Sequence, residues 1–210
     1  GMGAIYLARN EGAAGFVRPV VIKRILPDLI GDELTAKLFA REARIMSNLR
    51  HPGIVSVLEF AYEGGAYIMV LEYVHGFHLG RWYRFIKRSG SHFPVQLAVH
   101  IVISVLDALH YAHTLKGADG KELNIIHRDI KPSNILIDVD GHVKLADFGV
   151  ARMQTERTEA SSQSTIKGTF SYLAPEILQG GEPSASTDLY SCGVLLHELL
   201  TGRNEFSHKD

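Results

Sequence analysis

Cysteine is nearly absent from this chain of 210 residues, and so is any imbalance of charge. Cys192 is the single thiol, so an internal disulfide is excluded and a reducing, cytoplasmic setting is the default. Lys and Arg number 22 against 23 for Asp and Glu, a formal net charge of -1. This balance provides no broad basic surface for nucleic acid or an anionic membrane, although a local cluster could still bind a small phosphate ligand.

Long apolar runs are also missing. The longest, within residues 189–200, is shorter than the ~20 residues that a membrane-spanning helix requires. We therefore expect a buried helix there and no membrane segment in these residues. The first residues do not have the basic, apolar and small-residue pattern of a signal peptide.

The first third of the chain mixes strand-like and helix-like patterns. Strands are predicted over residues 4–8, 20–25, 54–60 and 67–73. Over residues 34–49, apolar residues recur at helical spacing. Glu42 falls on that apolar stripe, four positions after Leu38 and four before Met46. Because a carboxylate on a buried face is costly unless a cation or hydrogen-bond donors meet it, the pattern predicts a partner for Glu42.

The rest of the chain is mainly helical in pattern. Helices are predicted over residues 79–87, 94–115 and 188–200, the second of them apolar on most of its circumference and therefore buried. Residues 138–141 form a turn between two short strands. Residues 154–167 are rich in Ser and Thr and lack periodicity, so we expect a mobile or conditionally ordered segment.

Three short motifs carry the strongest chemical signal. Residues 127–129 read His-Arg-Asp and are followed by Asn134, five positions after the aspartate. Residues 147–149 read Asp-Phe-Gly, and residues 174–176 read Ala-Pro-Glu. Each motif alone is weak, but the ordered set is specific. On these motifs the sequence resembles the eukaryotic-like (Hanks-type) serine/threonine protein kinases of bacteria, over essentially its whole length.

The resemblance implies an α+β, bilobal protein-kinase-like fold. A small lobe, an antiparallel β-sheet with one helix, would span residues 1–71, a hinge residues 72–76, and a larger, mainly helical lobe residues 77–210. The family's phosphate loop reads Gly-x-Gly-x-x-Gly-x-Val, and only its last glycine is matched, by Gly3. Further helices would follow residue 210. We therefore expect a kinase domain truncated at both ends, whose activity in isolation could be weak or absent.

The resemblance also implies a role for each charged residue of the site. Asp129 would accept the proton of the substrate hydroxyl or orient that hydroxyl. Asn134 and Asp147 would supply hard oxygen ligands to Mg²⁺, with Mn²⁺ as an alternative. Lys23 would hold the α- and β-phosphates of ATP and pair with Glu42. Taken singly, Lys23 and Glu42 would instead be a surface lysine and a solvated helix glutamate.

Two further positions favour a Ser or Thr acceptor. Lys131 lies two residues after the catalytic aspartate, where serine/threonine kinases carry Lys, and Thr169 precedes Ala-Pro-Glu at the position of a threonine that bonds the catalytic Asp and Lys. The ATP pocket would be formed by Gly3, Ile5, Val21, Lys23, Glu72, Val74 and Leu136, with Leu71 as gatekeeper. Its aliphatic members could equally be plain core.

Regulation and function complete these expectations. Arg128 beside the catalytic aspartate implies control by phosphorylation of the activation loop, with candidates Thr155, Thr158, Ser161, Ser162, Ser164 and Thr165. The resemblance also allows self-association of two copies for autophosphorylation. Two classes of function are compatible with the motifs. The leading hypothesis is an ATP-dependent protein serine/threonine kinase acting on protein substrates. The alternative is a pseudokinase-type nucleotide-binding scaffold, although the residues that pseudokinases commonly lose, Lys23, Asp129 and Asp147, are all present. A small-molecule phosphotransferase is disfavoured by residues 168–176.

Overall fold

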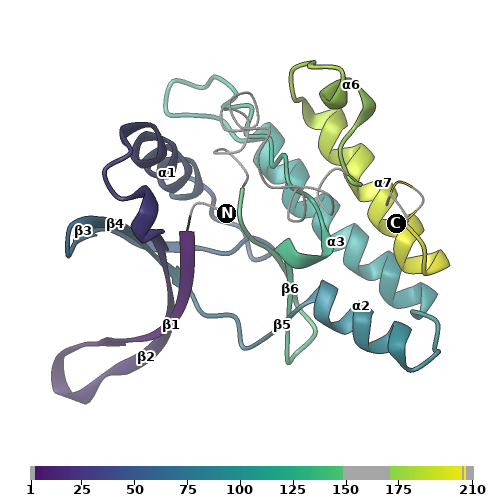
Figure 1. The fold of residues 1–210 in the computed structure, drawn as a ribbon, viewed down its shortest axis with the longest axis horizontal. Coiled ribbons are helices and arrows are strands. Elements are labelled where there is room, and N and C mark those ends of the chain that lie inside the picture. Colours follow the sequence, from purple (N-terminus) through teal and green to yellow (C-terminus); the bar gives the residue numbers. More distant parts are fainter. Residues whose placement is uncertain (1–2, 149–170, 205, 207–210) are drawn as a thin grey trace.

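Four strands in the first third of the chain form one antiparallel sheet. They are β1 (Gly3–Glu11), β2 (Val17–Ile25), β3 (Val57–Glu63) and β4 (Ala66–Glu72), in the order β1-β2-β4-β3. The computed structural model describes residues 3–148, 171–204 and 206. The register pairs Ile5 with Lys23 and Val21 with Leu71. Lys23 therefore lies on β2, an inner strand of the sheet. Figure 1 shows this strand next to β1.

Helix α1 (Glu33–Met46) follows β2 and packs against β2, β3 and β4. Its first turn is capped by Asp32, whose carboxylate accepts a hydrogen bond from the backbone N–H of Thr35 at 2.9 Å. The predicted apolar stripe faces the core, where Phe39 and Met46 are buried together with Glu42. The helix thus carries one carboxylate into the interior of this lobe.

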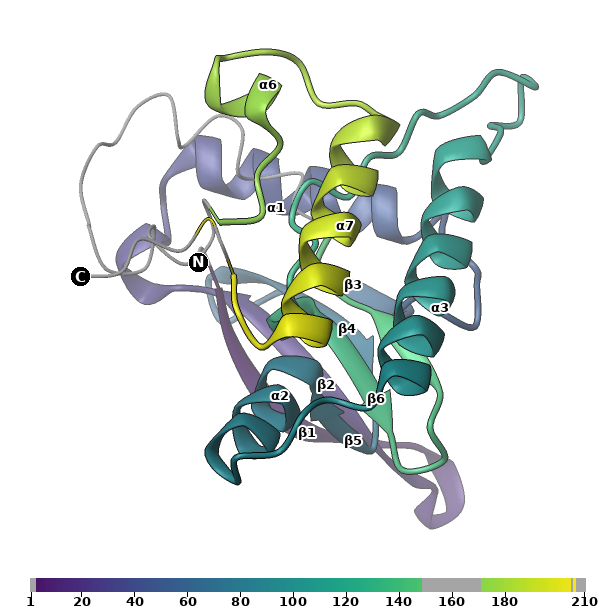
Figure 2. The ribbon, with the colours of Figure 1, turned by 90° about the vertical axis from the view of Figure 1, so that its right-hand side faces the viewer.

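The second lobe is mainly helical. It contains α2 (Leu79–Arg88), α3 (Val95–Thr114), α6 (Pro175–Leu178) and α7 (Ala185–Thr201), together with a small sheet of β5 (Gly76–His78), β6 (Ile135–Asp138) and β7 (Val143–Leu145). Helices α3 and α7 pack against each other, as Figure 2 shows. A short 3-10 turn, Pro132–Asn134, leads from the middle of the chain into β6.

Within the described residues, the helices and strands predicted from the sequence are confirmed, with two differences. The predicted mobile segment, residues 154–167, lies outside the described residues. Strand β3 begins at Val57 instead of residue 54, because Ile54 and Val55 pair with Leu145 of β7. The N–H of Val55 donates to the Leu145 carbonyl at 2.9 Å, and the N–H of Leu145 donates to Gly53 at 2.8 Å. These bonds join the two lobes.

Helix α3 is less completely buried than its composition predicts. Seven of its residues lie in the core, but Val95, Val99 and Ile103 are exposed, because α7 and β7 cover only one side of the helix. With a mean hydropathy of 1.5, α3 is also the one helix of the described residues that is long and apolar enough to cross a membrane by length and composition alone. Its buried side belongs to the core, so the same composition is explained by packing.

Candidate active site

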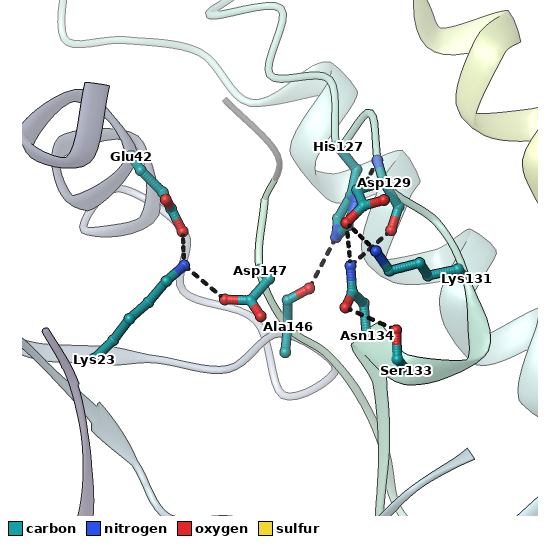
Figure 3. A network of polar contacts seen from close by, with 9 residues as sticks. All are labelled: Lys23, Glu42, His127, Asp129, Lys131, Ser133, Asn134, Ala146 and Asp147. Atoms are coloured by element: carbon teal, nitrogen blue, oxygen red, sulfur yellow. Dashed lines mark hydrogen bonds and ion pairs between the residues drawn. The ribbon is translucent and has the colours of Figure 1, made fainter. Parts of the chain in front are cut away.

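Three charged side chains from distant parts of the chain meet between the lobes. The Lys23 ammonium lies 2.6 Å from Oε1 of Glu42 and 2.9 Å from Oδ1 of Asp147 (Figure 3). Lys23 comes from β2, Glu42 from the buried face of α1, and Asp147 from the segment that follows β7. The partner that the sequence predicts for Glu42 is therefore present.

The electrostatics of this cluster favour the charged forms of Lys23 and Asp147. Burial lowers the pKa of Lys23, but the carboxylates of Asp147 and Glu42 outweigh burial and raise it above the ordinary value. Burial raises the pKa of Asp147, yet Lys23 more than offsets it and the net shift is downward. For Glu42 the balance differs, because burial dominates and raises the pKa in spite of Lys23. Glu42 consequently depends on the lysine to stay ionised.

A second cluster is formed around Asp129. Lys131 Nζ lies 2.9 Å from Asp129 Oδ2, and the side-chain amide of Asn134 donates to the same oxygen at 2.7 Å and to the Asp129 carbonyl at 2.9 Å. Both donors approach the carboxylate from the turn Pro132–Asn134 and its preceding residue, as Figure 3 shows. Asp129 is buried, with 8% of its surface exposed. Its carboxylate is thus fixed in orientation.

Asp188 holds the backbone that precedes Asp129. This carboxylate, in the first turn of α7, accepts hydrogen bonds from the backbone N–H groups of His127 and Arg128, each at 2.8 Å. The Nε2 atom of His113 on α3 lies 2.8 Å from Asp188 as well. Arg128 has a φ of 70°, a conformation that non-glycine residues adopt rarely and that the surroundings must stabilise. Asp188 supplies that support.

His127 is a packing residue of the site. Its ring lies 4.5 Å from the ring of Phe148, centroid to centroid, and both residues are fully buried. The N–H of Asp129 donates to His127 Nδ1 at 3.2 Å, and His127 Nε2 lies 3.1 Å from the Ala146 carbonyl. One neutral tautomer satisfies both contacts. Burial accordingly lowers the pKa of His127.

Two of the residues expected around adenine lie on strands of different sheets, Val21 on β2 and Leu136 on β6. Val21 pairs with Leu71 across the sheet, and Leu136 pairs with His78 in the small sheet. The N–H of Glu72 donates to the Ser56 carbonyl at 3.0 Å, so an adenine contact from Glu72 would have to come from its own carbonyl oxygen. The pocket of about 330 Å³ between the start of α1 and the β3–β4 turn contains none of the predicted site residues.

The remaining residues predicted for the ATP pocket lie on β1 and after β4. Gly3 and Ile5 lie on β1 opposite Ile25 and Lys23, and Ile5 is exposed. Val74 is half-buried against the core. Thr169, Gly149 and the candidate phosphorylation sites lie outside the described residues.

The donor set suits a hard divalent cation. Because the Asn134 amide nitrogen donates to Asp129, the amide oxygen is left on the opposite side, 3.4 Å from the Ser133 hydroxyl. Asp147 contributes a carboxylate to the same region of the site (Figure 3). Amide and carboxylate oxygens are the ligands that Mg²⁺ and Mn²⁺ accept. The residues present therefore fit the expected metal.

Two site residues were missed by sequence reasoning. Asp188 lies in a helix that is otherwise largely apolar, so the argument that predicts a partner for Glu42 could have found it. Lys144 on β7 binds Glu72 Oε1 at 2.9 Å, and the same oxygen accepts the Ser56 N–H at 2.9 Å. Lys144 alternates with buried neighbours like any surface residue of a strand, so its sequence context gives no signal.

Comparison with known proteins agrees with this geometry. The family model for the protein kinase domain matches residues 1–210. The chain is 36% identical over 210 residues to the tyrosine-protein kinase MasK of Myxococcus xanthus and 37% identical over 206 residues to the serine/threonine-protein kinase PrkC of Bacillus subtilis. These two matches cover 100% and 98% of this chain. The chain spans only 32% and 29% of the length of the two relatives.

A solved structure extends the similarity to three dimensions. The kinase domain of PknI from Mycobacterium tuberculosis superposes with a TM-score of 0.69 at 27% identity, covering 97% of this chain and 71% of that chain. The bilobal α+β arrangement expected from the motifs is thereby confirmed. With a family match over its whole length and the same fold, the chain belongs to the protein kinase domain family.

Proposed function

We propose that the protein transfers the γ-phosphate of ATP to Ser or Thr hydroxyls of protein substrates. The observation that carries the proposal is the joint arrangement of Lys23, Glu42 and Asp147 on one side and Asp129, Lys131 and Asn134 on the other. Phosphoryl transfer needs little covalent chemistry from the protein, and such a site supplies positioning and charge stabilisation.

Each cluster has its own task in this reaction. Lys23, held by Glu42, would bind the α- and β-phosphates of ATP, and Asp129 would orient the acceptor hydroxyl and receive its proton. Asn134 and Asp147 would hold Mg²⁺, which when bound neutralises charge on the phosphates. Gly3, Ile5, Val21 and Leu136 would enclose the nucleotide, and the backbone of Glu72 and Val74 would bind adenine.

The acceptor class rests on Lys131. Its ammonium shares Asp129 Oδ2 with the Asn134 amide, and from there it could contact the γ-phosphate while the hydroxyl approaches Asp129. Relatives named as serine/threonine kinases and one named as a tyrosine kinase are similarly close in sequence. The acceptor therefore needs its own test. Thr169 is proposed to assist, and phosphorylation between residues 155 and 165 is proposed to regulate the site, on the basis of the sequence alone.

The experiment is transfer of radiolabel from γ-labelled ATP by the full-length protein, followed by phosphoamino acid analysis of a generic protein substrate. We expect phosphoserine and phosphothreonine with wild type, and loss of label with Asp147→Ala. Phosphotyrosine alone would refute the proposed acceptor class. Nucleotide binding without any transfer, equal in wild type and Asp147→Ala, would instead favour the pseudokinase alternative.

A further inference from the structure

Acidic residues are missing from one long stretch of the chain. Residues 73–106 contain no Asp or Glu, although the chain as a whole is balanced in charge. The same stretch contains four cationic residues, and all four lie on α2: Arg81, Arg84, Lys87 and Arg88. A helix with four cations and no anion repels itself unless a partner of opposite charge is near.

The helix divides these cations between two faces. Leu79 and Tyr83 are buried, and Lys87 is held in the fold, donating to the Gly202 carbonyl at 3.0 Å and lying over the Tyr83 ring. Positions 81, 84, 85 and 88 share the opposite face. We call Arg81, Arg84, Phe85 and Arg88 the basic stripe. All four are exposed, Phe85 to 71%, and no described residue forms an ion pair with the three arginines.

The basic stripe starts close to the turn Pro132–Asn134, which follows Asp129 and Lys131. Helix α2 packs against the turn Pro132–Asn134, and a Cβ atom on Gly80 would lie 3.4 Å from the Pro132 side chain. His78, which caps α2, accepts a hydrogen bond from the Arg81 N–H at 3.2 Å and pairs with Leu136 in the small sheet. From Arg81 the stripe runs along α2 for about 10 Å at the rise of an α-helix, and in Figure 1 α2 extends away from β5 and β6.

We propose that the basic stripe on α2 is a docking site for an acidic segment of the protein substrates, and that it sets a preference for Ser or Thr near runs of Asp or Glu. This inference rests on the proposed kinase function and names its substrate class. Arginines bind carboxylates in bidentate geometry, and Phe85 offers one apolar contact among them. A segment bound there lies beside Pro132–Asn134 and so holds its acceptor close to Asp129.

An acidic protein segment fits better than a membrane or a nucleic acid. The apolar face of α2 is already buried against the core, so the helix cannot insert that face into a bilayer. Nucleic acids require a wider basic surface than three arginines, and the overall charge of -1 adds no net positive field to them. A stripe of three arginines and one aromatic matches a short acidic peptide.

The test compares two synthetic peptides with the full-length protein. Each has one Thr, with six Glu residues on one side in the first peptide and six Gln residues in the second. The test variant is Arg84→Gln/Arg88→Gln. The matched control is Lys116→Gln/Lys121→Gln, which removes the same charge from exposed positions of the loop after α3. Phosphorylation gives kcat/KM, and fluorescence anisotropy gives the dissociation constant of each labelled peptide.

We expect the Glu peptide to be the better substrate of wild type. In Arg84→Gln/Arg88→Gln its kcat/KM should fall about three- to tenfold, the effect of two exposed charge contacts, while the Gln peptide and the control variant stay unchanged. The advantage of the Glu peptide should shrink as salt rises, because exposed charges are screened within about 10 Å at 0.1 M.

Equal kcat/KM for the two peptides in wild type would overturn the docking proposal and leave the kinase assignment intact. So would an equal loss in the test and control variants, which would indicate an unspecific charge effect. If vesicles containing phosphatidylserine bind wild type but not the test variant while the peptides show no preference, the stripe contacts membranes and the proposal is wrong. If neither the peptides nor the generic protein substrate is phosphorylated, the proposed function fails. Whenever the peptides are not phosphorylated, anisotropy decides the docking proposal, and equal dissociation constants for the two peptides would overturn it.

Discussion

The ammonium group of Lys23 lies 2.9 Å from a carboxylate oxygen of Asp147, although 124 residues separate them in the sequence. The contact exists because Leu145 exchanges backbone hydrogen bonds with Gly53 and Val55, which ties β7 to the segment before β3. Asp147 has a φ of 56°, an uncommon conformation for an aspartate that its surroundings must hold. Lys23 is therefore both a candidate ligand of phosphate and a link between the lobes.

Removal of Lys23 should cost activity and stability for separate reasons. Lys23→Met leaves Glu42 and Asp147 without their cation. We therefore expect the free energy of unfolding, measured in urea, to fall by about 1–3 kcal/mol. Phosphoryl transfer should fall by a factor of about 100 or more because the phosphates lose a preorganised charge.

The double variant Lys23→Met/Glu42→Gln separates these two effects. It removes the stranded carboxylate of α1, so part of the lost stability should return while activity stays low. Urea unfolding of the two variants and of wild type measures this coupling. A double variant no more stable than Lys23→Met would contradict the account.

Asp188 should matter for turnover although it lies below the reacting atoms. In Asp188→Asn, one side-chain atom becomes an NH₂ group facing a backbone N–H donor, so the support of the positive φ at Arg128 is weakened. We expect kcat to fall about 10- to 100-fold through misplacement of Asp129, with a smaller change in KM for ATP. His113→Gln retains a donor toward Asp188 and serves as the control. Wild-type kcat in Asp188→Asn would contradict an anchoring role.

His127 makes the stability of the fold depend on pH. Its pKa is lowered by burial. As the pH falls, His127 is therefore protonated in the unfolded chain before it is protonated in the folded chain. The stability is complete above the ordinary histidine pKa of about 6.5 and is lost as the pH falls below it. Between about pH 7.5 and about pH 5.5 this residue can cost no more than about 1.4 kcal/mol.

The variant His127→Phe isolates that contribution. It should be less stable than wild type at neutral pH, because the N–H of Asp129 loses its acceptor. Its stability should nevertheless change less between the two pH values than that of wild type. Urea unfolding at both pH values measures the difference, and an identical pH dependence in the two proteins would show that His127 does not titrate as described.

Prediction from the sequence succeeded where one residue contradicts its local pattern. Glu42 on an apolar helix face required a cation or hydrogen-bond donors, and Lys23 is that partner. Residues whose role depends on the packing of distant elements were out of reach: Lys144 meets Glu72 only because β7 lies next to the end of β4. The exposed side of α3 could not be predicted either, since composition does not state which neighbours cover a helix. Asp188 could have been found by the same argument as Glu42, because it is a buried carboxylate on a largely apolar helix.

The proposed base gives the most direct test of the central claim. Asp129→Asn preserves shape and removes the charge that Lys131 contacts, whereas Asp140→Asn makes the same change at an exposed turn after β6. The measurement is the rate of γ-phosphate transfer to a Ser/Thr protein substrate by each full-length variant. We predict a fall of about 10²- to 10⁴-fold for Asp129→Asn and a wild-type rate for Asp140→Asn. Equal rates in both variants and wild type would contradict the assignment of this site as the catalytic centre.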